Sequence, residues 1–211
     1  MEQAEHNAPE PTLLDLAATL DTDGMIGFTQ RFHEDMQDGF DAVNTDLFPW
    51  LNDLKRAPWA GILCLGMGGS AAGGDFLAAL AAHQGGCPVI VHRDYGLPAW
   101  FDATWLVLAT SHSGNTEVTV AAAEAALKRD ATVIVIATGG VLAGLAELSP
   151  RCYLIPTVGG QPPRTAFGHI FSRQLAAVEH LGLLPRQERK ERQGMLERLA
   201  ANNQHFDVLS Q

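Results

Sequence analysis

Hydroxyl and amide side chains gather in the segment TSHSGNTE, residues 110–117, directly after the apolar run WLVLA. A helix-forming stretch, EVTVAAAEAAL, follows, so the positive end of that helix dipole points back at the same segment. Several hydrogen-bond donors beside a helix N-terminus suit a phosphate, whose oxygens accept several hydrogen bonds. An ordinary turn would use only one or two such residues. The candidate phosphate ligands are Ser111, Ser113, Asn115 and Thr116.

A second segment of small residues, GMGGSAAGGD, follows the apolar run GILCL. Gly68 and Gly69 let backbone N–H groups approach a ligand closely, because no Cβ stands in the way. Ser70 offers a hydroxyl to a helix N-terminus or to a ligand oxygen. The spacing also fits G-x-G-x-x-A, a weak form of the dinucleotide fingerprint, with Asp94 as the acid for a ribose. This segment alone is therefore compatible with a nucleotide-binding site. A dinucleotide site, however, would not require the hydroxyl-rich segment at residues 110–117.

Arg164 is a third candidate, because two prolines stiffen the chain before it in QPPRTAFGH and a long helical pattern follows. The N-terminal end of a helix disfavours a cation, so a nearby anion is expected to compensate its charge. A guanidinium fixed there is able to bind a carboxylate or an anionic substrate. The alternative is an ordinary surface arginine.

The elements that must position these candidates alternate along residues 58–185. Short apolar runs predict five strands, near Ile62, Val89, Leu106, Val133 and Leu154. Continuous apolar strands separated by helices are typical of a parallel sheet covered on both faces. The predicted fold is therefore α/β, a three-layer αβα sandwich around a five-stranded parallel sheet. Ligands of such sheets bind beyond the carboxyl ends of the strands, where all three candidate segments are expected.

Three flanking segments complete the predicted domain organisation. Residues 1–11 are polar and without periodicity, and we expect them to be disordered. Residues 12–57 are predicted to be helical, with Thr12 as an N-cap and a further helix over residues 28–43. Residues 186–211 are predicted to form a C-terminal helix or linker.

Composition excludes several partners. The 211 residues carry 24 acidic side chains against 14 Lys and Arg, a net charge of −10, so nucleic acid and anionic membranes are not expected. The sequence shows no signal-peptide pattern and no membrane span, which favours a cytoplasmic protein. Cys64, Cys87 and Cys152 are interpreted as buried, reduced thiols. The histidines lack metal-ligand spacing, so we expect neither a metal nor a cofactor.

The three segments together resemble the SIS (sugar isomerase) domain superfamily, and within it the first of the two SIS domains of bifunctional phosphoglucose/phosphomannose isomerases. The resemblance covers about residues 59–184. Family members usually carry an aromatic residue where this chain has His112. The resemblance implies that the small-residue segment lines a sugar site and that the hydroxyl-rich segment binds phosphate. It also implies that Arg164 lies near the reacting carbons, where a cation stabilises an enediolate.

The activity implied by the resemblance is an aldose–ketose isomerisation of glucose 6-phosphate or mannose 6-phosphate to fructose 6-phosphate, in a homodimer. The family's catalytic Glu and His belong to a second SIS domain, expected here to be missing or separate. His112, His169 and Glu117 lie near the predicted site and are weaker candidates for proton transfer. A SIS domain that binds a sugar phosphate without turnover, as a sensor or a degenerate subunit, is the alternative.

Overall fold

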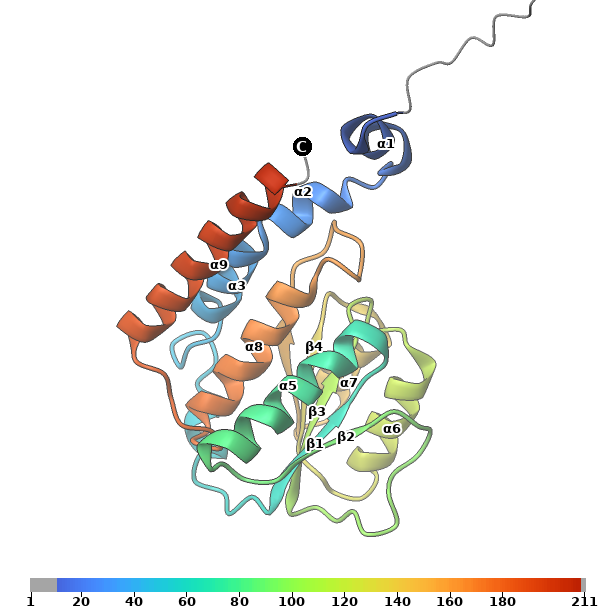
Figure 1. Ribbon diagram of the computed structural model, residues 1–211. Helices are drawn as coiled ribbons and strands as arrows, with labels where there is room; N and C mark the ends of the chain where they lie inside the picture. Colours follow the sequence, from blue (N-terminus) through green and yellow to red (C-terminus); the bar gives the residue numbers. More distant parts are fainter. Residues whose placement is uncertain (1–10, 210–211) are drawn as a thin grey trace, which may run out of the picture.

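One parallel sheet organises the chain, of which the computed structural model describes residues 11–209 (Figure 1). Its strands run in the order β2-β1-β3-β4-β5, and every neighbouring pair is parallel. Each of the five predicted strands is confirmed. Their bounds are β1 Gly61–Leu65, β2 Val89–His92, β3 Trp105–Thr110, β4 Val133–Ala137 and β5 Cys152–Pro156.

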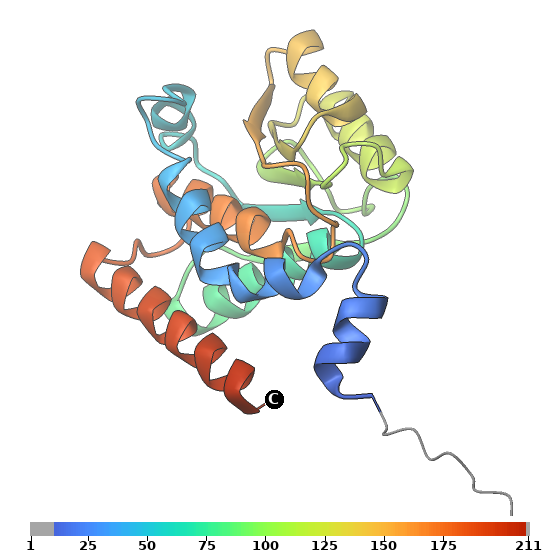
Figure 2. The same cartoon turned by 90° about the horizontal axis from the view of Figure 1, so that it is seen from above.

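Helices cover both faces of the sheet, because alternate side chains of each strand point to opposite sides. Ile62 and Cys64 pack with α5 (Gly68–Gln84) and α8 (Phe167–His180). Leu63 and Leu65 pack with α6 (Glu117–Leu127) and α7 (Gly140–Leu148). The view from above in Figure 2 separates these two groups of helices. The predicted three-layer αβα sandwich is therefore confirmed.

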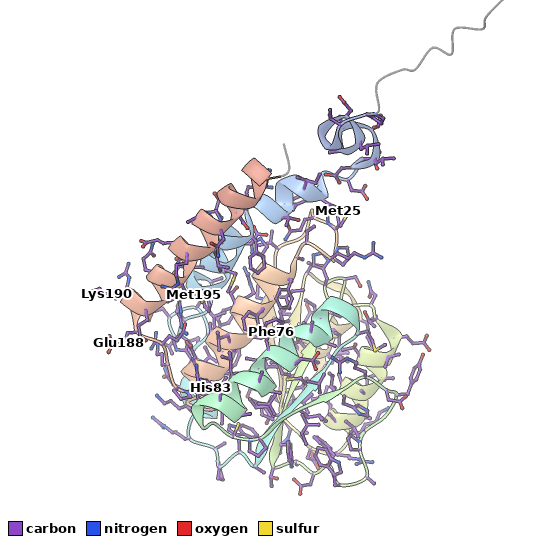
Figure 3. The ribbon with its side chains drawn as sticks, in the orientation of Figure 1. Met25, Phe76, His83, Glu188, Lys190 and Met195 are labelled. Carbon is purple, nitrogen blue, oxygen red and sulfur yellow. The ribbon has the colours of Figure 1, made fainter. Side chains whose placement is uncertain are left out.

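Further helices precede and follow the sandwich. They are α1 (Leu13–Leu20), α2 (Met25–Gln30), α3 (Phe32–Asp41), α4 (Trp50–Leu54) and α9 (Arg189–Leu209). α3 packs on α8, and α9 packs on α3. Met195, labelled in Figure 3, and the buried Leu196 attach α9 to the core on the α8 side. Thr12 caps α1 as predicted, through a capping box with Asp15, and α1 stands away from the sandwich in Figures 1 and 2.

The prediction of one helix over residues 28–43 is wrong, because the chain breaks at Arg31 between α2 and α3. The Arg31 N–H donates to the carbonyl of Phe28, one residue short of the α-helical partner. The break turns α3 so that its buried Met36 and Phe40 face the core. Phe32 of α3 stacks on Phe167 at the start of α8, with ring centroids 6.2 Å apart.

The three cysteines are free thiols, and Cys64 and Cys152 are buried as predicted, whereas Cys87 is only half-buried. Burial raises the pKa of Cys64 to about 12 and that of Cys152 to about 11, so both remain protonated and unreactive. Within residues 11–209, no helix combines the length and the apolar character needed to cross a bilayer. The segment predicted to be disordered, residues 1–11, lies outside the described residues except for its last position.

Candidate functional site

The order in which the chain adds strands to the sheet reverses between β1 and β3. These two strands are neighbours, with Leu65 paired to Ala109. From β1 the chain enters α5 on one face of the sheet, and from β3 it enters α6 on the other face. In open α/β sheets, ligands bind at the carboxyl ends of the strands where two such loops depart toward opposite faces. This switch point brings the two loops that sequence analysis selected next to each other.

The loop after β1 is pressed against the end of β3. A Cβ on the buried Gly66 would lie 3.1 Å from the carbonyl oxygen of Thr110. Gly68 has a φ of +52°, a conformation that favours glycine, and it begins α5. Within the described residues, the N–H groups of Gly68 and Gly69 and the hydroxyl of Ser70 have no hydrogen-bond partner in the chain. These donors are available to a ligand at a helix N-terminus.

The loop after β3 holds a short relay of hydroxyl groups. The N–H of Gly114 donates to Ser111 Oγ at 3.2 Å, and Ser111 Oγ lies 2.8 Å from Thr116 Oγ1. If Ser111 donates to Thr116, the hydrogen of Thr116 is free for a ligand oxygen. Ser111 itself is 2 % exposed, whereas Ser113 is exposed and Thr116 is half-buried. Ser113 and Thr116 are therefore the hydroxyls that reach the surface, and Ser111 supports Thr116 from below.

The same loop is clamped by the loop after β4. Gly114 has a φ of +71°, and a Cβ on it would lie 1.8 Å from the carbonyl oxygen of Gly139. Thr138 donates through its N–H and its hydroxyl to the carbonyl of His112. Asn115 Oδ1 accepts the N–H of Val141 at 3.0 Å and so satisfies the first turn of α7. Half of the Asn115 amide thus has a structural role, and only its Nδ2 remains for a ligand.

Arg164 lies in the turn before α8, where the chain passes the first loop. A Cβ built on Gly69 would lie 4.0 Å from the carbonyl oxygen of Pro163, so the two segments are neighbours. The turn is closed by Thr165 Oγ1, which donates to the carbonyl of Pro162 at 2.9 Å. Arg164 is exposed and has no acidic partner within residues 11–209. Its guanidinium therefore remains available to an anion, in a turn whose backbone passes Gly69.

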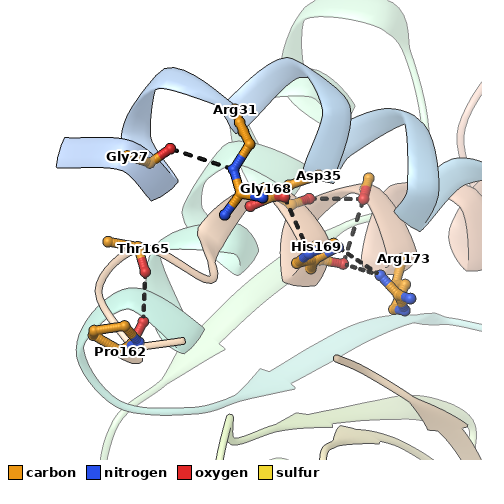
Figure 4. A network of polar contacts seen from close by, with 9 residues as sticks. Gly27, Arg31, Asp35, Pro162, Thr165, Gly168, His169 and Arg173 are labelled. Atoms are coloured by element: carbon orange, nitrogen blue, oxygen red, sulfur yellow. Dashed lines mark hydrogen bonds and ion pairs between the residues drawn. The ribbon is translucent and has the colours of Figure 1, made fainter. Parts of the chain in front are cut away.

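His169, a weaker candidate from the sequence, joins α3 to α8 instead of facing a ligand (Figure 4). Its Nε2 lies 3.2 Å from Asp35 Oδ1, and the histidine is 5 % exposed. Arg173 donates to the carbonyls of His169 and Pro156, each at 3.0 Å. Burial lowers the pKa of His169 and raises that of Asp35, while the attraction between the two opposes both changes.

The other two weaker candidates also have local roles. The carbonyl of His112 is held by Thr138, and burial lowers the pKa of its half-buried imidazole. The imidazole Nε2 is buried without a hydrogen-bond partner. Glu117 is exposed in the first turn of α6, where its carboxylate interacts favourably with the helix dipole. Neither residue has the fixed geometry that identifies a general base.

A cavity of about 760 Å³ lies away from these loops, where α5 and α8 end. Lys55, His180 and Arg186 line it, together with Gly85 and Gly182 after the last helical turns. Cations at helix C-termini are expected because they complement the negative ends of the dipoles. The same dipoles disfavour an anion, and none of the candidate site residues contributes to this cavity.

Sequence analysis missed two contributors to the site. One is the loop Thr138–Gly140, for which the signal was the TGG sequence directly after the fourth apolar run. The other is Gln174, a buried polar residue of α8 that contacts Thr110 and Ser70. A glutamine between apolar stretches of a helix is a weak signal, because its partners lie far away in the sequence.

The model of the SIS domain family matches residues 57–179. The bifunctional phosphoglucose/phosphomannose isomerase of Caldicellulosiruptor bescii is 42 % identical over 123 residues, which are 58 % of this chain and 36 % of that protein. This chain therefore spans little more than a third of that relative's length.

Solved structures share the fold. Tagatose-6-phosphate ketose/aldose isomerase from Escherichia coli superimposes with a TM-score of 0.59 at 23 % identity, covering 78 % of this chain and 48 % of that one. The Vibrio vulnificus NanR protein, complexed with ManNAc-6P, superimposes with a TM-score of 0.56 at 21 % identity, covering 94 % of this chain and 73 % of that one. The tagatose-6-phosphate isomerase and the NanR protein thus both share the fold of this chain.

We expect His169→Gln to weaken the dependence of stability on pH. Burial lowers the pKa of His169, so below about pH 6.5 the unfolded chain binds a proton that the folded chain refuses. Wild-type stability should therefore fall as the pH decreases from about 6.5 to 5, with this histidine contributing at most about 1.4 kcal/mol per pH unit. Urea unfolding at several pH values measures the slope. His83→Gln, at an exposed histidine labelled in Figure 3, is the matched control. An unchanged slope in His169→Gln would contradict the assignment.

Proposed function

Because the chain belongs to the SIS domain family, we propose that it binds a phosphorylated sugar at the switch point between β1 and β3. The proposal depends on one observation: two adjacent loops carry unpartnered N–H and O–H donors at the starts of two helices. Neutral donors aligned with a helix dipole hold a phosphate without placing a cation beside it. We further propose that the protein works in the cytoplasm, consistent with its free cysteines.

The phosphate is proposed to lie against the loop after β3. Ser113 and Thr116 donate from their hydroxyl groups, and the Nδ2 of Asn115 is free to add a third bond. Ser111 fixes the orientation of Thr116 through their 2.8 Å contact. The positive end of the α6 dipole adds a favourable interaction with the charge of the phosphate.

The sugar is proposed to lie against the loop after β1. There Gly68 and Gly69 present N–H groups and Ser70 presents a hydroxyl, all suited to the oxygens of a sugar. Pro163 lies beside Gly69, and the next residue, Arg164, is proposed to face the carbons near the carbonyl. A cation at that position stabilises the negative charge of an enediolate as it develops.

The reaction we propose is an aldose–ketose isomerisation of glucose 6-phosphate or mannose 6-phosphate to fructose 6-phosphate. It moves one proton between neighbouring carbons and needs a second group to open the sugar ring. Within the described part of the chain, His169 is paired with Asp35 and Glu117 is exposed on α6. We therefore propose that a second SIS domain supplies the catalytic Glu and His, as the family resemblance implies.

A binding protein without turnover is the second candidate. It is favoured by the engagement of His169 in packing, which leaves the site with donors and Arg164 but without a positioned base in residues 11–209. Such a protein would report the concentration of a sugar phosphate or would serve as an inactive subunit.

Replacing the exposed donors should remove ligand binding while preserving the fold. At fructose 6-phosphate concentrations of about 100 times Kd, we expect the wild-type melting temperature to rise by about 5–10 °C. The double variant Ser113→Ala/Thr116→Val should show no rise, although its unliganded melting temperature should fall only modestly, because the Ser111–Thr116 contact is lost but neither replaced side chain is fully buried. Ser149→Ala, at a serine that follows α7, should respond like the wild type. A full response from the double variant would refute the phosphate site.

The two candidate functions differ in turnover. We expect this chain to bind fructose 6-phosphate without forming glucose 6-phosphate in a coupled assay. Addition of a second SIS domain, taken from the corresponding part of a relative, should restore turnover if the protein is an isomerase. Continued inactivity would favour the binding protein. Turnover by this chain alone would show that residues within it transfer the proton.

We also propose a homodimer, because the sites of the resembling isomerases use residues from two subunits. Sedimentation equilibrium at micromolar concentration should give twice the monomer mass of 22.6 kDa. A mass of one chain at all accessible concentrations would exclude the dimer.

A further inference from the structure

Gln174 of α8 lies between the two loops of the proposed site. Its side chain is buried, with the residue 1 % exposed, among contacts between α8 and the sheet that are mainly apolar. Nε2 donates to Thr110 Oγ1 at 2.9 Å and makes a longer contact of 3.5 Å with the carbonyl oxygen of Ser70. One amide group thus contacts the end of β3 and the first turn of α5.

The chemistry of the partners fixes the orientation of this amide. The Ser70 carbonyl can only accept a hydrogen bond, so the NH₂ group of Gln174 must face it. The two hydrogens of Nε2 then serve Ser70 and Thr110 separately. Oε1 points the other way, toward Gly73, where a Cβ would lie only 1.9 Å from it. Oε1 is buried without a hydrogen-bond partner, a costly arrangement that must be compensated by the contacts of Nε2.

Both contacts fall one residue from a proposed ligand group. Ser70 follows Gly69, whose N–H is free, and Thr110 precedes Ser111, which orients Thr116. Gly66 and Gly73 allow the close approach of these segments, since a Cβ on either would meet neighbouring atoms. The amide therefore sets the spacing between the sugar loop (residues 66–70) and the phosphate loop (residues 111–116).

We propose that Gln174 is a positioning residue that couples the sugar loop to the phosphate loop. This inference rests on the proposed function, since it assigns the two loops to two parts of one ligand. A ligand that touches both loops depends on their spacing, whereas inorganic phosphate touches only one. Gln174 therefore discriminates between a sugar phosphate and free phosphate without contacting either.

The test replaces the amide by a side chain of similar length that has no donor. In Gln174→Met, the Kd for fructose 6-phosphate should rise about tenfold, the loss expected for one hydrogen bond. The Kd for inorganic phosphate should stay within about twofold of the wild-type value. Thr110→Val removes the other partner and should have the same effect, and the double variant should be no weaker than either single variant. Isothermal titration calorimetry measures all of these values.

Gln84→Met is the matched control, because Gln84 is exposed at the far end of α5. It should bind both ligands like the wild type. Wild-type binding of fructose 6-phosphate by Gln174→Met would overturn the proposal. An equal loss of affinity for both ligands would also overturn it, since a general loosening of the fold does not discriminate between them.

A second measurement separates this inference from the proposed function. If the wild type binds neither ligand, the proposed function fails, but hydrogen exchange still tests the coupling. The amides of Ala71 and Ser111 should exchange about tenfold faster in Gln174→Met than in Gln84→Met, because both loops lose the same anchor. Unchanged exchange at either loop would overturn the coupling.

Discussion

The carboxyl ends of β1 and β3 lie side by side, and the rest of the site depends on this pairing. Because the sheet order places β2 on one side and β4 and β5 on the other, the chain must leave these two strands toward opposite faces. Each exit starts a helix whose first N–H groups cannot find partners within that helix. Unpartnered N–H donors at this edge of the sheet are therefore a consequence of topology before any side chain is chosen. In the proposed function, the glycines and hydroxyl residues of the two loops add the groups that select the ligand.

Buried polar contacts on α8 hold the elements around this edge of the sheet in position. Apolar packing keeps α8 on the sheet but does not fix its position along the strands, since dispersion contacts have little directional preference. Gln174 makes directional hydrogen bonds toward β3 and α5. His169 and Arg173 make directional contacts toward α3 and the end of β5. Each contact requires a buried polar group, which is costly if a partner is lost. The same helix thus provides hydrophobic burial on one side and polar contacts beside the loops after β1 and β3 on another.

The strands and the loops after β1 and β3 were predictable because their sequence signals are local. Continuous apolar runs identify buried parallel strands. Each loop is marked by residues suited to a helix start, such as Gly68 at the beginning of α5 and Thr116 at the N-cap of α6. The break at Arg31 was not predictable, because residues 28–43 keep a helical pattern and only packing of α3 on α8 turns the chain. Similarly, the sequence did not reveal that Asn115 Oδ1 accepts a hydrogen bond from the N–H of Val141, which is distant in the sequence. Partners separated by many residues leave no periodic signal.

The proposed phosphate loop contains no lysine or arginine, and this fits the charge of the whole protein. At a net charge of −10, long-range attraction does not bring an anion to the surface, so recognition must come from short-range hydrogen bonds at fixed positions. Such bonds depend on geometry more strongly than a mobile cation does. A loop of neutral donors is therefore useful only if it is rigid. The bonds among Ser111, Gly114 and Thr116 and the clamp by Thr138 and Val141 supply that rigidity. In the proposed isomerisation, Arg164 is then free to act at the sugar, where negative charge develops on the reacting carbons and oxygens only during the reaction.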